Sequence, residues 1–315
     1  MRRYLKICVA VTAVIANSLS GVAATPDSVT VCHRDYLRSG VSAAGALAVN
    51  AGLTEVLKNS VHRVRPNGQD DHSFPSRHTS WAFTVSSVVS RELYAVSPWW
   101  GMGAQAVATG IGMQRVLGRH HYGSDVAAGA LTGIVSTEIA YRVTELLWHH
   151  KCRPVRPEAR FAPSLTLRTG SMFPIGHGHG VDMATAFTAD LSAYVPVAGS
   201  HWTAGADLGM IASPLTHDGD YLRPMTVITL GPSATYALHV ARGWNLEASA
   251  GAGGALTDNA APEFRRWGFT ARAGVDMVWQ LTAKCAATGG VGYRLLTLPT
   301  AFNSVTVSLG TRACF

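Results

Sequence analysis

Hydrophobic and polar residues follow two different periods in the two halves of this chain. Up to about residue 148 the apolar residues recur at helical spacing, and beyond about residue 161 they alternate with polar ones. The helices that we expect cover residues 42–62, 81–93, 99–116 and 124–148, the last with Ser124 as its N-cap. None of them is an uninterrupted apolar run of membrane-spanning length.

The alternating half predicts eight strands. The runs lie at residues 161–173, 181–195, 202–212, 228–240, 244–252, 267–281, 283–295 and 305–315. Their connections alternate between short turns and longer loops, which is the pattern of a small outer-membrane barrel. We therefore predict a two-domain protein, with an N-terminal all-α helical bundle and a C-terminal eight-stranded antiparallel transmembrane β-barrel.

A soluble β-sandwich would also alternate, but the polar positions favour a barrel. They combine Gly, Ser and Thr with charged residues, which suits a narrow lumen filled by side chains. These charged residues are Arg168, Asp207, Glu247, Arg272 and Arg312. The terminal Phe315 resembles the carboxy-terminal signature of such barrels. An even number of strands puts both barrel termini on the periplasmic side, so we expect an outer-membrane protein whose helical domain hangs into the periplasm.

The amino terminus has the layout of a cleaved secretory signal. Arg2, Arg3 and Lys6 precede an apolar stretch at residues 7–16, and small residues follow at 21–24. The predicted organisation is a signal peptide at 1–24, a helical domain at 25–151, a proline-rich and charged linker at 152–160, and the barrel at 161–315.

Four cysteines remain after the predicted cleavage, and an even number in an exported chain suggests two disulfides. Cys32 and Cys152 bracket the helical segment and could tie its ends together. Cys285 and Cys314 would meet at one rim of the barrel. The face assignment puts Cys285 outward and Cys314 inward, so this second pairing stays open.

Three short blocks in the helical half carry groups that handle phosphate. The first holds Lys58 and Arg65, the second is the run Phe74–Pro75–Ser76–Arg77–His78, and the third holds Arg115, His121 and Asp125. The lysine and the two arginines supply cations for a phosphoryl group. Ser76 and Arg77 lie where a turn leads into a helix, so that free N–H groups can face an anion.

The two histidines in these blocks supply the candidate chemistry. His121 precedes Asp125 by one helical step (i, i+4), so the carboxylate could orient the imidazole ring. An oriented neutral imidazole is a competent nucleophile toward phosphorus. His78 could protonate the departing alkoxide.

Taken together, the blocks resemble the signature of the phosphatidic acid phosphatase / vanadium haloperoxidase superfamily. The resemblance implies that His121 forms a phosphohistidine supported by Asp125, and that His78 is the general acid. It also implies that Lys58, Arg65 and Arg115 hold the phosphate together with the Ser76 hydroxyl and the Arg77 amide. It covers roughly the first half of the mature chain, which is more similar to the soluble exported members than to the multi-span lipid phosphatases.

The chain departs from the family pattern at two positions. Arg77 replaces a usual glycine and places a side chain beside the phosphate, where we expect it to favour a more anionic substrate; Gln114 replaces a usual serine. Neither change removes a group that the mechanism needs. His62, His72 and His120 are interpreted as bystanders on the rim of the site.

The function predicted is a metal-independent phosphatase without a cofactor, acting on phosphomonoesters or lipid phosphates. Lipid A is one candidate substrate, although it faces outward while the predicted domain faces the periplasm. A vanadium-dependent haloperoxidase is the alternative, since vanadate mimics a pentacoordinate phosphoryl group, and a non-catalytic module with a decayed site is a third. The formal net charge of +7 fits anionic lipids, and we expect no nucleic acid and no obligate protein partner.

Overall fold

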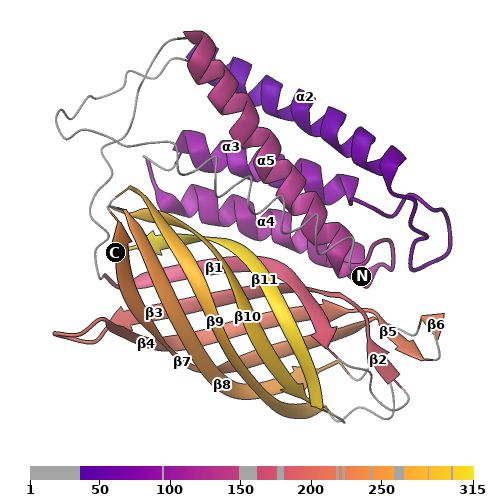
Figure 1. Ribbon diagram of the computed structural model, residues 1–315, viewed down its shortest axis with the longest axis vertical. Coiled ribbons are helices and arrows are strands. Elements are labelled where there is room, and N and C mark those ends of the chain that lie inside the picture. The colour runs from indigo at the N-terminus through magenta and orange to yellow at the C-terminus, as the bar shows by residue number, and fades with distance from the viewer. Residues whose placement is uncertain are drawn as a thin grey trace.

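The computed structural model describes residues 36–93, 96–148, 162–175, 181–217, 220–221, 224–241, 243–258, 266–282, 284–298 and 301–315. Four antiparallel helices are followed by a closed barrel (Figure 1). The helices are α2 (Tyr36–Ser60), α3 (Arg77–Leu93), α4 (Pro98–Leu117) and α5 (Gly123–Trp148). α4 begins as its sequence predicts, because the Ser97 side chain accepts a hydrogen bond from the Trp99 N–H and Pro98 occupies the first helical turn.

The barrel consists of eight antiparallel strands. They are β1 (Ser164–Ile175), β3 (Ala186–Pro196), β4 (Trp202–Ser213), β7 (Met225–Ala241), β8 (Trp244–Thr257), β9 (Trp267–Thr282), β10 (Cys285–Thr297) and β11 (Ala301–Cys314). The first strand pairs with the last, so the sheet closes without an edge. This confirms the predicted fold class.

One predicted strand is broken. Residues 181–195 were expected to form a single strand, but the chain leaves the barrel at Ala184 and Thr185. The first part is β2 (Val181–Met183), which pairs with β5 (Leu215–His217) and β6 (Asp220–Tyr221) in a small separate sheet. The alternation continues through the break, which is why the pattern alone does not reveal it.

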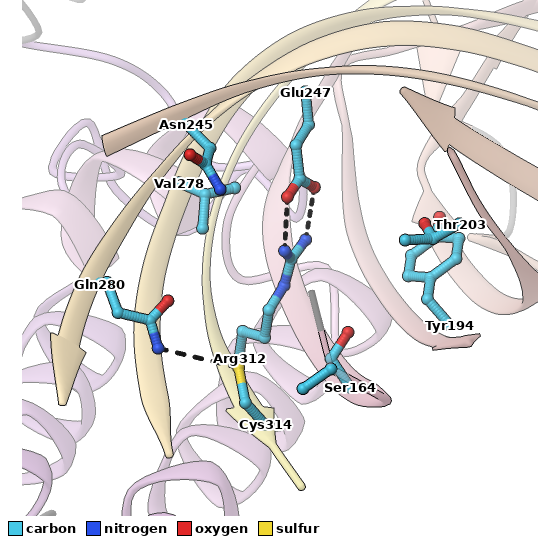
Figure 2. Close-up of a pocket in the computed structure, with 10 residues that line it drawn as sticks. Ser164, Tyr194, Thr203, Asn245, Glu247, Val278, Gln280, Arg312 and Cys314 are labelled. Carbon is cyan, nitrogen blue, oxygen red and sulfur yellow. Dashed lines mark hydrogen bonds and ion pairs between the residues drawn. The ribbon is translucent and has the colours of Figure 1, made fainter. Parts of the chain in front are cut away.

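Ion pairs fill the lumen of the barrel. They are Arg168–Asp276, Arg272–Asp207, Arg294–Asp190 and Arg312–Glu247. Figure 2 shows the last of them in a pocket of the lumen, where both Arg312 Nη atoms reach the Glu247 carboxylate at 2.6 and 2.7 Å. Each carboxylate inside the barrel thus has a guanidinium partner, as a buried charge requires. The inward polar face predicted from the alternation is confirmed.

The two rims of the barrel differ. At the rim that we call the short-turn rim, β1 begins, β11 ends, and only a few residues separate β3 from β4, β7 from β8 and β9 from β10. At the opposite, long-loop rim, β1, β4, β8 and β10 end and β3, β7, β9 and β11 begin, and longer stretches of sequence separate most of these strands. The small sheet of β2, β5 and β6 lies at the long-loop rim (Figure 1).

The helices lie along the outer wall of the barrel. α4 packs against β1, β3, β4 and β11, and α5 packs against β1 and β3. Met113, Val116 and Val126 of the helices form one apolar cluster with Phe187 and Ala212 of the wall. The sequence leads us to expect a helical domain that extends from the barrel termini. The structure differs, because outward-facing side chains of these strands pack against the helices along the side of the barrel.

The predicted Cys285–Cys314 disulfide is not present, since both cysteines are free and buried. In the register Cys285 faces Ala313, so Cys314 belongs to the opposite face of its strand. The other predicted pair, Cys32–Cys152, lies outside the described residues, as do the signal peptide and the linker at 152–160.

Candidate active site

All three phosphate-handling blocks meet at the end of the helical bundle beside the long-loop rim. The predicted residues lie in helix ends and in the two connections between them: Lys58 in the last turn of α2, Arg65 in the segment after it, Ser76, Arg77 and His78 at the start of α3, Arg115 in the last turn of α4, His121 before α5, and Asp125 in its first turn. An up-and-down bundle brings both connections to one end, and this gathers residues that are up to 67 positions apart (125 − 58).

His121 is held as a neutral imidazole. Its side chain is almost wholly buried, and Nδ1 lies 2.7 Å from the Ser73 carbonyl oxygen. Because a carbonyl only accepts, Nδ1 carries the proton and Nε2 carries a lone pair. Burial, followed by the nearby Arg65 guanidinium, lowers the pKa of His121 to about 3. Its Nε2 lone pair points toward Arg65 Nη1 at 3.4 Å, which is where an anion would bind.

Asp125 does not act on His121 in the predicted way. His121 precedes α5, so the i, i+4 geometry does not apply, and Asp125 bonds to other groups. Its Oδ1 accepts from Arg63 Nη1 at 2.6 Å, and its Oδ2 accepts from Ser73 Oγ at 2.5 Å and from the Tyr122 N–H at 3.1 Å. Asp125 therefore fixes the backbone of Ser73, whose carbonyl in turn holds the imidazole. Burial raises the pKa of Asp125, while Arg63 and these hydrogen bonds oppose the shift.

Three cations surround His121. Lys58 is buried and donates to the His72 carbonyl at 2.7 Å, and Arg65 donates through Nε to Asp70 at 2.7 Å. Arg115 Nε is buried without a hydrogen-bond partner among the described residues. Burial, then the charge of Arg65, lowers the pKa of both Lys58 and Arg115. Cations that repel one another in a partly buried place favour the binding of an anion.

The start of α3 adds donors to the same place. Ser76 is fully buried, and its hydroxyl accepts from Thr79 Oγ1 at 2.9 Å. The first N–H groups of α3 have no partner within the helix. Burial, then Arg115, lowers the pKa of His78, which places this ring among the cations. The Arg77 guanidinium forms an ion pair with Glu55 at 2.7 Å on the exposed rim of the site. The side chain that stands in place of the usual glycine is therefore held by an acidic neighbour.

Two residues that organise the site were missed in the sequence. Arg63 binds Asp125, donates to Ser124 Oγ at 2.7 Å, and stacks on the Tyr122 ring at 3.7 Å. Ser73 links Asp125 to His121. Arg63 lies between Lys58 and Arg65 in the first block, so its position in the sequence could have indicated a role in the site. Ser73 contacts His121 through its backbone carbonyl, and the residue type gives no indication of such a contact.

The helical part of the chain matches a known family. Residues 39–148 match the model of the PAP2 superfamily. A lipid A 1-phosphatase of Porphyromonas gingivalis is 34% identical over 108 residues, which are 34% of this chain and 24% of that protein. The chain thus aligns with about a quarter of the length of that relative.

Solved barrels resemble the other half. Neisserial surface protein A covers 49% of this chain at 13% identity with a TM-score of 0.39, and 97% of that structure is matched. The outer membrane enzyme PagL covers 48% of this chain at 12% identity with a TM-score of 0.34, and 99% of it is matched. Because these scores are low, our description of the barrel rests on its own strand order and lumen.

Proposed function

We propose that this protein is a phosphatase that hydrolyses phosphate esters through a phosphohistidine at His121, a proposal supported by the match of residues 39–148 to the PAP2 superfamily model. The observation that carries the proposal is the neutral, buried imidazole of His121, whose Nε2 lone pair points into a group of cations. A nucleophile of this kind needs no separate base, since it is already deprotonated.

The steps follow from the positions of the groups. The phosphoryl group binds among Lys58, Arg65 and Arg115, and these cations stabilise the charge of the transition state. His121 Nε2 attacks phosphorus, the bond to the ester oxygen breaks, and that oxygen takes a proton from His78. Water then attacks the phosphohistidine, gives up a proton to His78, and releases inorganic phosphate and the free imidazole.

The barrel supports a place in the outer membrane. Its strands close fully, its lumen is polar and its outer wall is apolar, which is the construction of outer-membrane barrels. Such a location makes lipid phosphates the substrates of first interest. The name of the relative from Porphyromonas gingivalis, a lipid A 1-phosphatase, points in the same direction.

The test is the release of phosphate from an aryl phosphate by the mature protein, with and without a chelator. His121→Ala is expected to lose at least about 10³-fold in kcat. His62→Ala is the matched control, because His62 is an exposed histidine near the same site. A labelled phosphoenzyme that is acid-labile and stable to alkali is expected for the wild type alone. Release that persists in His121→Ala, or that the chelator abolishes, would contradict the proposal.

A further inference from the structure

The active site and the barrel termini lie at opposite ends of the molecule. The Gly123 N–H, beside His121, donates to the Thr185 carbonyl at 3.0 Å, where β3 begins at the long-loop rim. At the other end of the bundle, the Trp99 ring lies 5.5 Å from the ring of Phe315 at the short-turn rim. α4 therefore runs along the wall from one rim to the other, and the site is level with the long-loop rim (Figure 1).

The helical bundle is built with its polar side inward. Its contacts between helices use small and hydroxylated residues; the Thr54 and Ser80 hydroxyls meet at 3.2 Å, and Thr137 Oγ1 of α5 donates to the Thr84 carbonyl of α3 at 3.4 Å. Large apolar residues point outward instead: Val41, Trp81, Val85, Trp100, Val107 and Ile111. A bundle in water has the reverse arrangement, whereas helices in lipid pack through small residues and expose apolar ones.

Charged residues are confined to the two ends of the bundle. Residues 39–54 of α2, 79–90 of α3, 98–114 of α4 and 126–137 of α5 contain no Asp, Glu, Lys or Arg. At 1.5 Å per residue these segments are about 18 to 25 Å long, close to the apolar band of about 25 Å on outer-membrane barrels. By length and composition α2 is also a candidate membrane span among the described helices, which alone is weak evidence.

Aromatic side chains mark the same level on the helices and on the barrel. Near the short-turn rim, the rings of Trp202 and Tyr236 lie 5.0 Å apart and those of Trp244 and Trp279 lie 5.5 Å apart. Trp99 of α4 joins this level through its contact with Phe315. Aromatic girdles of this kind sit at the interface between lipid and water. The uncharged band of the helices thus continues the apolar band of the barrel.

We propose that the four helices lie in the bilayer against the barrel wall, and that the site takes the phosphate of a lipid from the leaflet at the long-loop rim. The substrate assignment rests on the proposed phosphatase function. Short turns face the periplasm in outer-membrane barrels, so this leaflet is the outer one. The sequence-based expectation placed the site in the periplasm because it assumed a domain hanging from the barrel termini. The lipid headgroup would reach Lys58, Arg65 and Arg115 at the membrane surface while its acyl chains stay beside the exposed residues of the band.

Single cysteines test the placement through reaction with a water-soluble maleimide in intact cells. Gln69→Cys marks the connection beside the site, Ala198→Cys marks a turn of the short-turn rim, and Val107→Cys marks the uncharged band, where Val107 is 67% exposed. All three positions are exposed. Labelling of the wild-type protein, which has cysteines of its own, gives the background reaction that is subtracted. We expect Gln69→Cys to react in intact cells and Ala198→Cys to react only after the outer membrane is permeabilised. Val107→Cys should react only after the protein is denatured in detergent. Equal reaction of Val107→Cys and Gln69→Cys, or reaction of Ala198→Cys alone in intact cells, would overturn the placement.

Vesicles that contain phosphatidic acid test the substrate. We expect the full mature protein to release phosphate from this lipid with a kcat/KM at least tenfold above that for water-soluble glycerol phosphate, and His121→Ala to release none. In vesicles, release to the outside should follow the fraction of molecules whose Gln69→Cys reacts from outside. Preference for the soluble ester would overturn the lipid assignment. Hydrolysis of neither substrate nor of the aryl phosphate would refute the phosphatase itself, while the labelling pattern would still decide the placement.

Discussion

Asp125→Asn separates the observed role of this carboxylate from the role that its spacing suggests. In the structure Asp125 reaches His121 only through Ser73, and it is fully buried with three donors around it. Asparagine keeps the size but replaces one accepting oxygen by an NH₂ group. In either orientation that group faces a donor, namely Arg63 on one side or the Tyr122 N–H on the other.

The cost can be worked out from these contacts. A lost hydrogen bond to a charged group costs about 1.5–3 kcal/mol, and a buried donor left unpaired adds about 1 kcal/mol or more. A total of about 2–4 kcal/mol corresponds to a fall of about 30- to 1,000-fold in kcat/KM, if the loss is expressed in the transition state. Ser73→Ala removes only the hydroxyl and keeps the carbonyl that holds His121 Nδ1, so a loss of about 1 kcal/mol, or about fivefold, is expected.

The assay is the steady-state hydrolysis of an aryl phosphate by both variants and by the wild type, after thermal unfolding has shown each to be folded. The order expected is wild type, then Ser73→Ala, then Asp125→Asn, then His121→Ala. A Ser73→Ala variant with unchanged activity beside a severely impaired Asp125→Asn would refute the indirect linkage and favour direct contact between Asp125 and the imidazole.

Three further predictions concern the pH dependence of activity, the pH dependence of stability, and helix packing. Since burial lowers the pKa of His121 to about 3 and also lowers that of His78, kcat/KM should fall as pH rises through the lowered pKa of His78, because this acid then loses its proton while His121 stays neutral. Between pH 6.5 and 3 the imidazole of residue 121 binds a proton in the unfolded chain and not in the folded one. The free energy of unfolding should therefore decrease as pH falls through this window, by up to about 1.4 kcal/mol per pH unit. Thermal unfolding of His121→Gln should show a smaller pH dependence. Gly133→Ala should destabilise the bundle by about 1–3 kcal/mol, because the added Cβ would lie 2.7 Å from Thr84 N and still closer to the Ser80 carbonyl; Gly103→Ala, which meets no atom within 4 Å, should leave the unfolding temperature unchanged or raise it.

Much of the barrel could be predicted from the sequence, because a wall between a polar lumen and an apolar exterior enforces strict alternation. Predicted and observed strands differ by a few residues at most of their ends, and the inward charges Arg168, Glu247 and Arg312 were assigned to the correct face. The break at Ala184 and Thr185 was not visible, since β2 keeps the same alternation while pairing in another sheet.

The helices were also predicted, but the direction of their apolar faces was not. Trp81 and Val85 form a stripe that a soluble bundle would bury, yet they are 38% and 51% exposed. A periodic stripe indicates that one face differs from the other, and it does not say which medium lies outside. Likewise, the blocks contain most of the residues that gather in the candidate site, whereas Ser73 acts through a backbone atom and depends on a contact across 48 positions.

The contacts between the helices and the wall give the barrel a part in the geometry of the site. His121 lies in the short connection between α4 and α5, and both helices are fixed on either side of it by Phe187 through Val116 and Val126. The connection itself is bonded to Thr185 through Gly123, where an added Cβ would overlap the backbone of Ala186. Because interiors are close-packed, a shift of the wall would move His121 relative to Lys58 of α2 and to the start of α3. The barrel therefore does more than anchor the chain, since it sets both the position of His121 and the level at which the site opens.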